Sequence, residues 1–265
     1  MASLSKLVKT VSFRIGALLA LSGVLSLIVS IFNGSSILAF IGLGLTFWGL
    51  IFLSLKPKKY VEGFMLESVA ISEYSTIDRI IRDLKCEGNG YYIPPFPSVA
   101  RVPEFLKALS DSVVFVSAKK DFRIPSVESM VEGRFLLSKS RGVLVSPPGF
   151  DLLIQIEKQS RISLAPMDPG QICDILSRYV TENFSLAKTM QIERSENEVT
   201  LKLSDSMFTN LYYPEKNLIS VGLIGCPIVS ALACALALST GRFVTIDKHV
   251  LSPNRLNLEV SYRLI

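Results

Sequence analysis

The sequence is poor in the residue types that most often build catalytic and metal sites. It contains one histidine and four cysteines in 265 residues, and no two cysteines are spaced as C-x-x-C. Spacing therefore argues against a zinc site, and we expect reduced, buried thiols if the domain is cytoplasmic. A phosphate loop is also missing, because no glycine-rich segment is followed by the lysine and serine that such a loop requires. We expect neither a metal nor a cofactor.

Acidic residues are missing from the first 59 positions, which contain six lysines and arginines. The remaining residues hold 22 basic against 23 acidic side chains, a net charge of −1, although the whole chain carries +5. The basic character therefore belongs to the N-terminal region, where it attracts anionic lipid headgroups and sets topology. The near-neutral remainder has no stripe of basic and aromatic residues, so nucleic acid is not an expected partner.

Two long apolar runs occupy most of this N-terminal region. Residues 13–32 carry one charge, Arg14, and residues 37–55 carry none. About 20 apolar residues at 1.5 Å per residue cross a ~30 Å hydrocarbon core. The runs therefore predict a transmembrane helical hairpin over residues 1–59. The alternative for the first run, a cleaved signal peptide, lacks a small-residue cleavage pattern and is followed at once by the second run.

The charges that flank the two runs predict their orientation. Lysines precede the first run and follow the second, whereas the turn at residues 33–36 carries no charge. Excess lysine and arginine in short loops marks the cytoplasmic side of a membrane. We therefore expect a multi-pass cell-membrane protein with cytoplasmic N- and C-termini and only the four-residue turn outside. The flanking residues are Lys6, Lys9, Lys56, Lys58 and Lys59.

Small residues recur at helical spacing in both runs. Such residues let helices approach closely in lipid, where no hydrophobic effect drives association. They favour packing of the two spans against each other, with a dimerisation face as the alternative. No acidic residue, histidine or lysine lies at mid-membrane depth, so a transporter or proton relay has no ionisable group to use. The small residues are Gly16, Ala20 and Gly23 in the first run and Gly42, Thr46 and Gly49 in the second.

Residues 60–265 are long enough for one large domain, or for two subdomains divided near residue 165. Helical and alternating apolar patterns both occur, which predicts a mixed α/β domain of the α+β class. One helix is expected to begin at Ser75 and end before residues 88–90, and the others cover residues 104–109, 150–158, 172–183 and 227–240. The expected strands cover residues 91–95, 113–116, 135–137, 143–145, 190–194, 199–203, 218–224, 243–250 and 256–264.

Two segments of this domain carry specific signals. Asp168, followed by Pro169 and Gln171, supplies the residue types of a helix N-cap, first position and capping box. Residues 221–241 contain no charge, so a third membrane span is an alternative there. That segment has Gly225 where a turn is expected and is rich in alanine and serine rather than leucine. These features favour a fully buried helix instead.

Cys226 is the one residue with a physical reason to suspect chemistry. It stands at the expected N-cap of the helix over residues 227–240, where unpaired N–H groups and the helix dipole lower the pKa of a thiol. A nucleophile also needs a base, and His249, the only histidine, falls on a strand that could lie beside this helix. No motif for an oxyanion hole is present, so a buried cap residue is the competing interpretation. Cys226 and His249 are the only catalytic candidates.

Several short motifs resemble those of uncharacterised archaeal membrane proteins. They are the two amino-terminal spans, a strand ending in Pro-Pro-Gly at residues 143–149, and a terminal Gly-Cys-Pro helix with a β-hairpin at residues 225–264. This resemblance implies an architecture without an activity. The terminal helix and hairpin also resemble the end of the small-molecule-binding domains of the vinyl reductase family, which implies a ligand role. The spaced cysteines of that family's hairpin are absent here.

The sequence leaves two functions open. The first is a membrane-anchored cytoplasmic scaffold or interaction module without catalytic activity, whose contacts are the lipid bilayer and a protein partner or a second copy of the chain. The second is a membrane-tethered sensor that binds a hydrophobic small molecule or lipid. The alanine- and glycine-rich segment at residues 221–241 motivates the sensor, because small side chains leave room for a ligand beneath a sheet.

Overall fold

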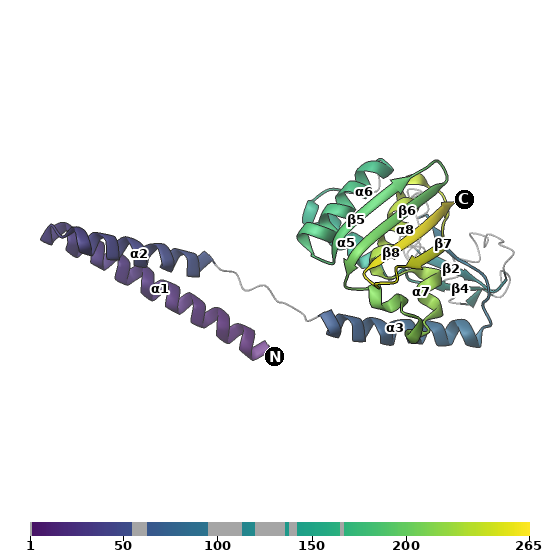
Figure 1. Ribbon diagram of the computed structural model, residues 1–265, viewed down its shortest axis with the longest axis horizontal. Coiled ribbons are helices and arrows are strands. Elements are labelled where there is room, and N and C mark those ends of the chain that lie inside the picture. The colour runs from purple at the N-terminus through teal and green to yellow at the C-terminus, as the bar shows by residue number, and fades with distance from the viewer. Residues whose placement is uncertain (1, 55–62, 95–112, 120–135, 138–141, 165–166) are drawn as a thin grey trace, which may run out of the picture. The chain divides into compact units, whose positions relative to one another are not determined.

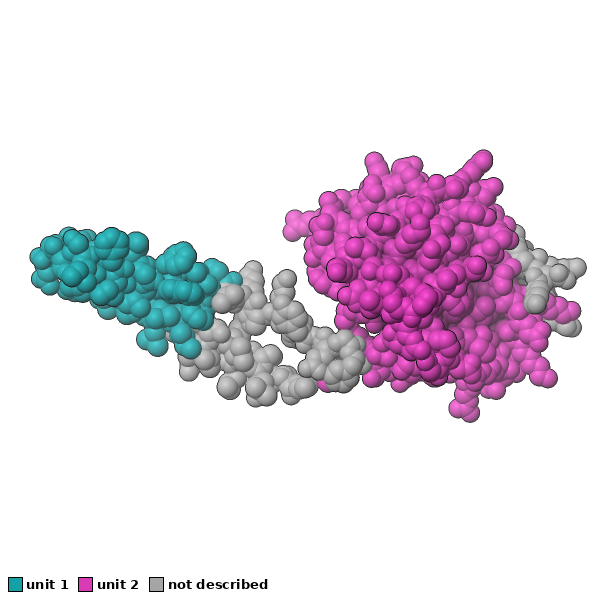
Figure 2. Space-filling view, viewed as in Figure 1, with its two compact units in different colours: residues 1–62 teal, residues 63–265 magenta. Residues whose placement is uncertain are grey.

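The computed structural model describes residues 2–54, 63–94, 113–119, 136–137, 142–164 and 167–265. The chain divides into two compact units, Met1–Glu62 and Gly63–Ile265, close to the expected boundary at residue 59 (Figure 2). The helix predicted over residues 104–109 and the connection at residues 138–141 lie outside the described residues.

Unit 1 consists of helix α1 (Ala2–Asn33) and helix α2 (Ser36–Ser54), joined by a turn at Gly34, whose φ is 63°. The segments Ile15–Asn33 and Ser36–Ser54 are each long and apolar enough to cross a membrane. Only 17% of the first segment and 11% of the second are buried, so most of their apolar side chains face outward. Apolar surface on this scale requires an apolar surrounding, and a bilayer supplies one.

Glycines allow the two helices of unit 1 to touch. A Cβ atom on Gly49 would lie 2.5 Å from the backbone nitrogen of Ala20, and one on Gly23 would lie 2.6 Å from that of Thr46. Both separations are too short for any side chain, so only glycine permits this approach. The predicted packing of the two spans against each other is confirmed, because these glycines contact the other helix of the hairpin.

Unit 2 contains one sheet of eight strands. The strands are β1 (Gly90–Ile93), β2 (Val113–Ser117), β3 (Leu136–Leu137), β4 (Gly142–Val145), β5 (Ala187–Arg194), β6 (Glu198–Ser206), β7 (Val244–Leu251) and β8 (Asn257–Leu264). Their order in the sheet is β3-β4-β2-β1-β7-β8-β6-β5, and all neighbours pair antiparallel. The predicted mixture of helices and strands is confirmed. Strands from both sides of residue 165 belong to this single sheet.

Unit 2 also contains five α-helices among its described residues. They are α3 (Gly63–Asp83), α5 (Phe150–Ser160), α6 (Pro169–Arg178), α7 (Ile219–Ile224) and α8 (Pro227–Thr240), with short helical turns at Tyr179–Asn183, Thr209–Tyr212 and Pro214–Lys216. Helix α8 packs beneath the sheet and is flanked by α5 and α6 (Figure 1). Asp168 caps α6 as predicted, because its carboxylate accepts a hydrogen bond from the backbone N–H of Gly170 at 2.7 Å.

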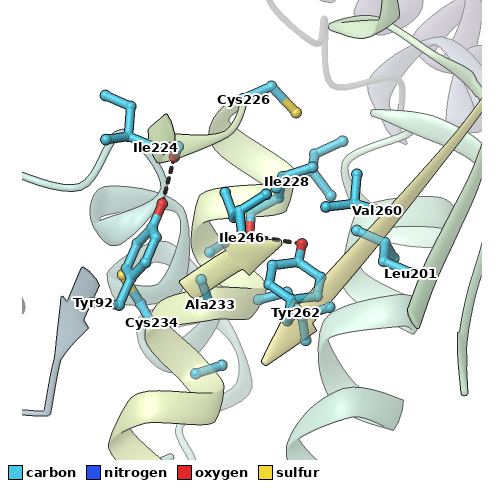
Figure 3. Close-up of a cluster of buried hydrophobic side chains, with 14 of the residues drawn as sticks. Tyr92, Leu201, Ile224, Cys226, Ile228, Ala233, Cys234, Ile246, Val260 and Tyr262 are labelled. Atoms are coloured by element: carbon cyan, nitrogen blue, oxygen red, sulfur yellow. Dashed lines mark hydrogen bonds between the residues drawn. The ribbon is translucent and has the colours of Figure 1, made fainter. Parts of the chain in front are cut away.

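Helix α8 forms the centre of the hydrophobic core. All ten residues from Ile228 to Ala237 are buried, and they pack against side chains such as Tyr92, Leu201 and Val260 (Figure 3). The helix ends at Gly241, whose φ of 66° gives the left-handed conformation that glycine adopts readily. Length and composition would also allow Ile219–Thr240 to span a membrane, but 78% of that segment is buried within the protein. The predicted buried helix is confirmed.

The strand predicted over residues 218–224 is wrong, because Ile219–Ile224 forms helix α7. The segment is rich in β-branched and apolar residues, which favours a strand by composition. Its helical start is stabilised from elsewhere in the chain. The carboxylate of Asp78 accepts hydrogen bonds from the backbone N–H groups of Ile219 at 2.9 Å and Ser220 at 2.7 Å. A cap supplied from such a distance leaves no local sequence signal.

The predicted start of the first helix of unit 2 is also wrong. Helix α3 begins at Gly63 rather than Ser75, and it ends at Asp83. Its first turns carry apolar residues on two faces, so the helical period is not visible there. The chain leaves the helix through Lys85, which has a φ of 52°, and the N–H of Cys86 then donates to the carbonyl of Ile81. This left-handed residue precedes the expected glycines at residues 88–90.

Candidate functional site

The break between α7 and α8 lies in the middle of the core and contains the predicted candidate Cys226. Helix α7 ends at Ile224, Gly225 adopts a φ of 67°, and α8 begins at Pro227. A break of this kind leaves carbonyl groups at the end of one helix and N–H groups at the start of the next without helical partners. Because the junction is buried, other groups of the protein must satisfy them.

Three buried tyrosines and the partly buried Tyr212 bind the backbone of this junction. Tyr74 donates to the carbonyl oxygen of Gly225 at 2.6 Å, and Tyr92 donates to that of Ile224 (Figure 3). Tyr262 donates to the carbonyl of Val229 at 3.0 Å, while the N–H of Cys226 donates to the hydroxyl of Tyr212 at 2.9 Å. These tyrosines come from α3, β1, β8 and the helical turn at Thr209–Tyr212, so the junction joins four separate parts of the fold.

The four hydroxyl groups stay protonated at neutral pH. Burial raises the pKa of Tyr74, Tyr92, Tyr212 and Tyr262 well above the usual value for tyrosine. Removal of a hydroxyl proton would place a negative charge in an apolar core, which is costly. The tyrosines therefore act as hydrogen-bonding groups of the junction and do not serve as general bases there.

The Cys226 thiol lies inside this junction and has no exposed surface. Burial raises its pKa, although the N–H groups of Val229 and Ile228 and the hydroxyl of Tyr212 act in the opposite direction. The sequence predicted a lowered pKa from the helix N-terminus. That prediction is wrong, because removal of the thiolate from water outweighs the neighbouring N–H groups. In the structure Cys226 is a buried residue at the start of α8.

His249 lies on β7 and shares a neighbour with Cys226. Its ring centroid is 5.3 Å from that of Tyr212, whose hydroxyl accepts the N–H of Cys226. Its Cε1 atom would lie 3.2 Å from a Cβ on Gly222, so the ring packs closely on α7. Partial burial lowers the pKa of His249, which favours the neutral imidazole. The two candidates thus flank one tyrosine, and no hydrogen bond between them is present among the described residues.

Sequence reasoning missed the polar residues that organise this junction. Tyr74 lies 151 positions from Gly225, and Asp78 lies 142 positions from Ser220. Asp78 is 3% exposed, which is unusual for a carboxylate. The one available signal was its position on the apolar side of the helix, beside Ile77 and Ile81. An acidic residue in such a stripe indicates a buried partner, but it does not identify that partner.

Two open depressions lie on the surface of unit 2. A groove of about 350 Å³ runs over β5, β6, β8 and the end of β7, and it is lined by polar residues such as Gln191, Lys202 and Glu259 together with three aliphatic ones. A second depression of about 270 Å³ is bordered by Glu67, Asp205 and other residues of polar character. Within the described ranges, no group of three or more histidine, cysteine, aspartate or glutamate side chains could hold a metal ion.

The protein thus combines a hairpin of two apolar helices with a following domain built on one antiparallel sheet. In that domain, tyrosine side chains bind the backbone at the junction between two helices. The chain belongs to a family described as a domain of unknown function, DUF7982, whose model matches residues 4–263. The family therefore includes both the helical hairpin and unit 2. No curated protein and no solved structure matches the chain.

Proposed function

We propose that this protein is a membrane-anchored scaffold that holds a protein partner, or a second copy of itself, at the cytoplasmic surface of the cell membrane and has no catalytic activity. The observation that carries the proposal is the open outer face of strands β5, β6 and β8. No element of the described chain covers this face, whereas α8 packs against the other (Figure 1).

The chemistry of this face suits a polar segment of a partner. Lys202 and Glu259 place opposite charges in the groove, and Thr189, Gln191 and Asn257 add hydrogen-bonding groups. Interfaces of transient complexes are polar at their rim and carry many hydrogen bonds. Among the described strands, β5 forms one edge of the sheet and pairs with β6, although Ser177 of α6 already donates to its Met190 carbonyl at 2.8 Å. An extended segment could add to the rest of this edge.

The helical hairpin supports the anchoring part of the proposal. Its two helices carry outward-facing apolar side chains, and its closely packed glycines contact the other helix of the hairpin. The hairpin therefore offers a lipid-facing surface, and residues 15–54 contain no acidic residue, histidine or lysine that a transport pathway could use. The lysines that flank the two apolar runs in the sequence support a cytoplasmic location for unit 2.

No observation favours the second function, a sensor for a hydrophobic small molecule or lipid. The segment at residues 221–241 was the expected site for such a ligand. In α8 the side chains from Ile228 to Ala237 are buried against their neighbours, and the two depressions described above lie elsewhere, on polar surfaces. The sensor function stays a prediction from sequence.

Crosslinking in native membranes tests the proposal. Cells producing the full chain with two different tags are treated with a short amine-reactive crosslinker, and the chain is purified in mild detergent. We expect a discrete crosslinked species, containing either one partner protein or both tags. Glu259→Arg should reduce its yield at least several-fold, because it replaces a groove carboxylate. Glu196→Arg is the matched control, since it makes the same charge change at an exposed turn outside the groove.

Two results would contradict the scaffold. One is recovery of the uncrosslinked chain alone, carrying a single tag, from several detergents and crosslinker lengths. The other is a crosslinked species whose yield falls equally with both substitutions, because the groove would then have no particular role. Circular dichroism of each purified variant confirms that a lost crosslink reflects a changed surface rather than an unfolded unit 2.

A further inference from the structure

The first turns of α3 expose apolar side chains on the side of the helix that faces away from the core. Met65 is 40% exposed, Leu66 is 36% exposed and Val69 is 68% exposed. Met65 and Val69 are four positions apart, so they lie one above the other on the same helix face. We call these three residues the α3 apolar stripe. Isolated apolar residues are common on protein surfaces, but a contiguous group on one helix face requires an explanation.

The stripe is confined to the start of the helix. Two turns later the same outward side carries the exposed polar residues Ser72, Thr76 and Arg79. The opposite side of α3 is fixed to unit 2 along its length, because Ala70, Tyr74, Ile77 and Ile81 are buried in the core. Rotation of the helix cannot bury the stripe, since it would expose these core residues. Whatever contacts the stripe therefore comes from outside the described part of unit 2.

The distance along the chain limits what that contact can be. Helix α2 ends at Ser54 and α3 begins at Gly63, so only eight residues connect them. Fully extended, such a connection spans at most about 30 Å. The connection therefore keeps the start of α3 within about 30 Å of the end of α2. Within the connection, Lys56, Lys58 and Lys59 supply charges that anionic lipid headgroups attract.

We infer that the α3 apolar stripe lies in the interfacial layer of the same bilayer that anchors the protein. The inference rests on the anchoring part of the proposed function and adds a second contact with lipid, made by unit 2 itself. Apolar residues on one face of a helix bind the boundary between headgroups and acyl chains, and nearby basic residues strengthen that binding. Such a contact restricts rotation of unit 2 about its connection and fixes which of its faces points away from the membrane.

Quenching of a fluorescent label by lipid tests this inference on the full chain in nanodiscs. An environment-sensitive maleimide dye is attached to Val69→Cys, with Arg79→Cys as a matched position on the outer side of the same helix. The four native cysteines are buried and do not compete for the dye. Leu25→Cys, on the outward side of α1, reports on membrane insertion of the hairpin. The nanodiscs contain ordinary lipid, lipid brominated near the headgroup end of the acyl chains or, for the label at residue 25, lipid brominated near the ends of the chains.

We expect brominated lipid to quench the label at residue 69 at least twofold and to leave the label at residue 79 nearly unchanged. The emission of the label at residue 69 should also shift to shorter wavelength. Quenching at residue 25 but not at residue 69 would overturn the inference while leaving the anchor intact. Absence of quenching at residue 25 would overturn the anchor and the inference together. Because the nanodisc contains no protein besides this chain and the scaffold belt, a water-exposed stripe would also show that lipid is not its partner.

Discussion

The hydroxyl oxygen of Tyr74 lies 2.6 Å from the carbonyl oxygen of Gly225, 151 positions further along the chain. Tyr74 belongs to α3, the first described element after the helical hairpin, and Gly225 lies in the buried break between α7 and α8. A second hydrogen bond joins the same two segments, because the hydroxyl of Ser220 donates to the carbonyl of Tyr74 at 3.2 Å. Helix α3 is therefore fixed to the centre of unit 2 by hydrogen bonds as well as by apolar packing.

Removal of the Tyr74 hydroxyl should destabilise unit 2. Tyr74→Phe preserves the ring but leaves the Gly225 carbonyl buried without its donor, which costs about 1–3 kcal/mol. Tyr213→Phe is the control, since no hydrogen bond of the Tyr213 hydroxyl is described and the ring that Arg255 approaches is retained. Urea unfolding of the full chain in detergent, followed by labelling of the buried thiols, measures the difference. Equal stability of the two variants would show that water replaces the lost bond.

The thiols of unit 2 should be inert in the folded protein. Cys86, Cys173, Cys226 and Cys234 are all buried, and burial raises the pKa of the first three. We expect iodoacetamide at pH 8 to modify none of them within an hour, and all four to react after addition of denaturant. Mass spectrometry of tryptic peptides identifies each site. Rapid modification of Cys226 in the folded chain would restore it as a candidate nucleophile.

Stability should fall as the solution becomes alkaline. Burial raises the pKa of Cys173 from 9.0 to about 11, and it also raises the pKa of the four junction tyrosines. The unfolded chain loses these protons at lower pH than the folded chain, and for Cys173 the contribution is fully present below pH 9 and is lost as the pH rises through about 11. Urea midpoints between pH 7 and pH 11 test this, and Cys173→Ala should have a smaller dependence. An unchanged midpoint up to pH 11 would contradict the burial of these groups.

The glycines of the hairpin should not tolerate larger residues. Gly49→Val forces α1 and α2 apart, because even a Cβ atom there would lie 2.5 Å from the Ala20 nitrogen. Gly44→Val is the matched control on α2, since a Cβ at Gly44 meets no atom within 4 Å. Trp48 is the only tryptophan, so its fluorescence during titration with sodium dodecyl sulfate reports on the hairpin alone. We expect a lower midpoint for Gly49→Val only, and equal midpoints would argue against close packing of the helices.

Local signals predicted the parts of the fold that depend on neighbouring residues. The two apolar runs predicted α1 and α2, and their small residues predicted the packing of one against the other. Asp168 before Pro169 predicted the start of α6, and Gly241 predicted the end of α8. Strand β6 follows the expected alternation, since Val199, Leu201 and Leu203 are buried.

Distant contacts explain what the sequence did not predict. Residues 218–224 have the composition of a strand, but the Asp78 carboxylate favours a helix by capping its first N–H groups. The start of α3 was missed because it carries apolar side chains on two faces, one against unit 2 and one exposed. For Cys226, the position at a helix N-terminus was predicted correctly, but its pKa depends on burial, which only the packing of α7, α8 and the tyrosines determines.

The location of unit 2 at the inner membrane surface is the central claim of this account, and accessibility of introduced cysteines in intact cells tests it most directly. Asn33→Cys lies at the turn between α1 and α2, and Lys158→Cys lies on the exposed side of α5. A membrane-impermeant maleimide should label the cysteine at residue 33 in intact cells and the cysteine at residue 158 only after the membrane is permeabilised. Labelling at residue 158 in intact cells would place unit 2 outside and contradict the proposed function.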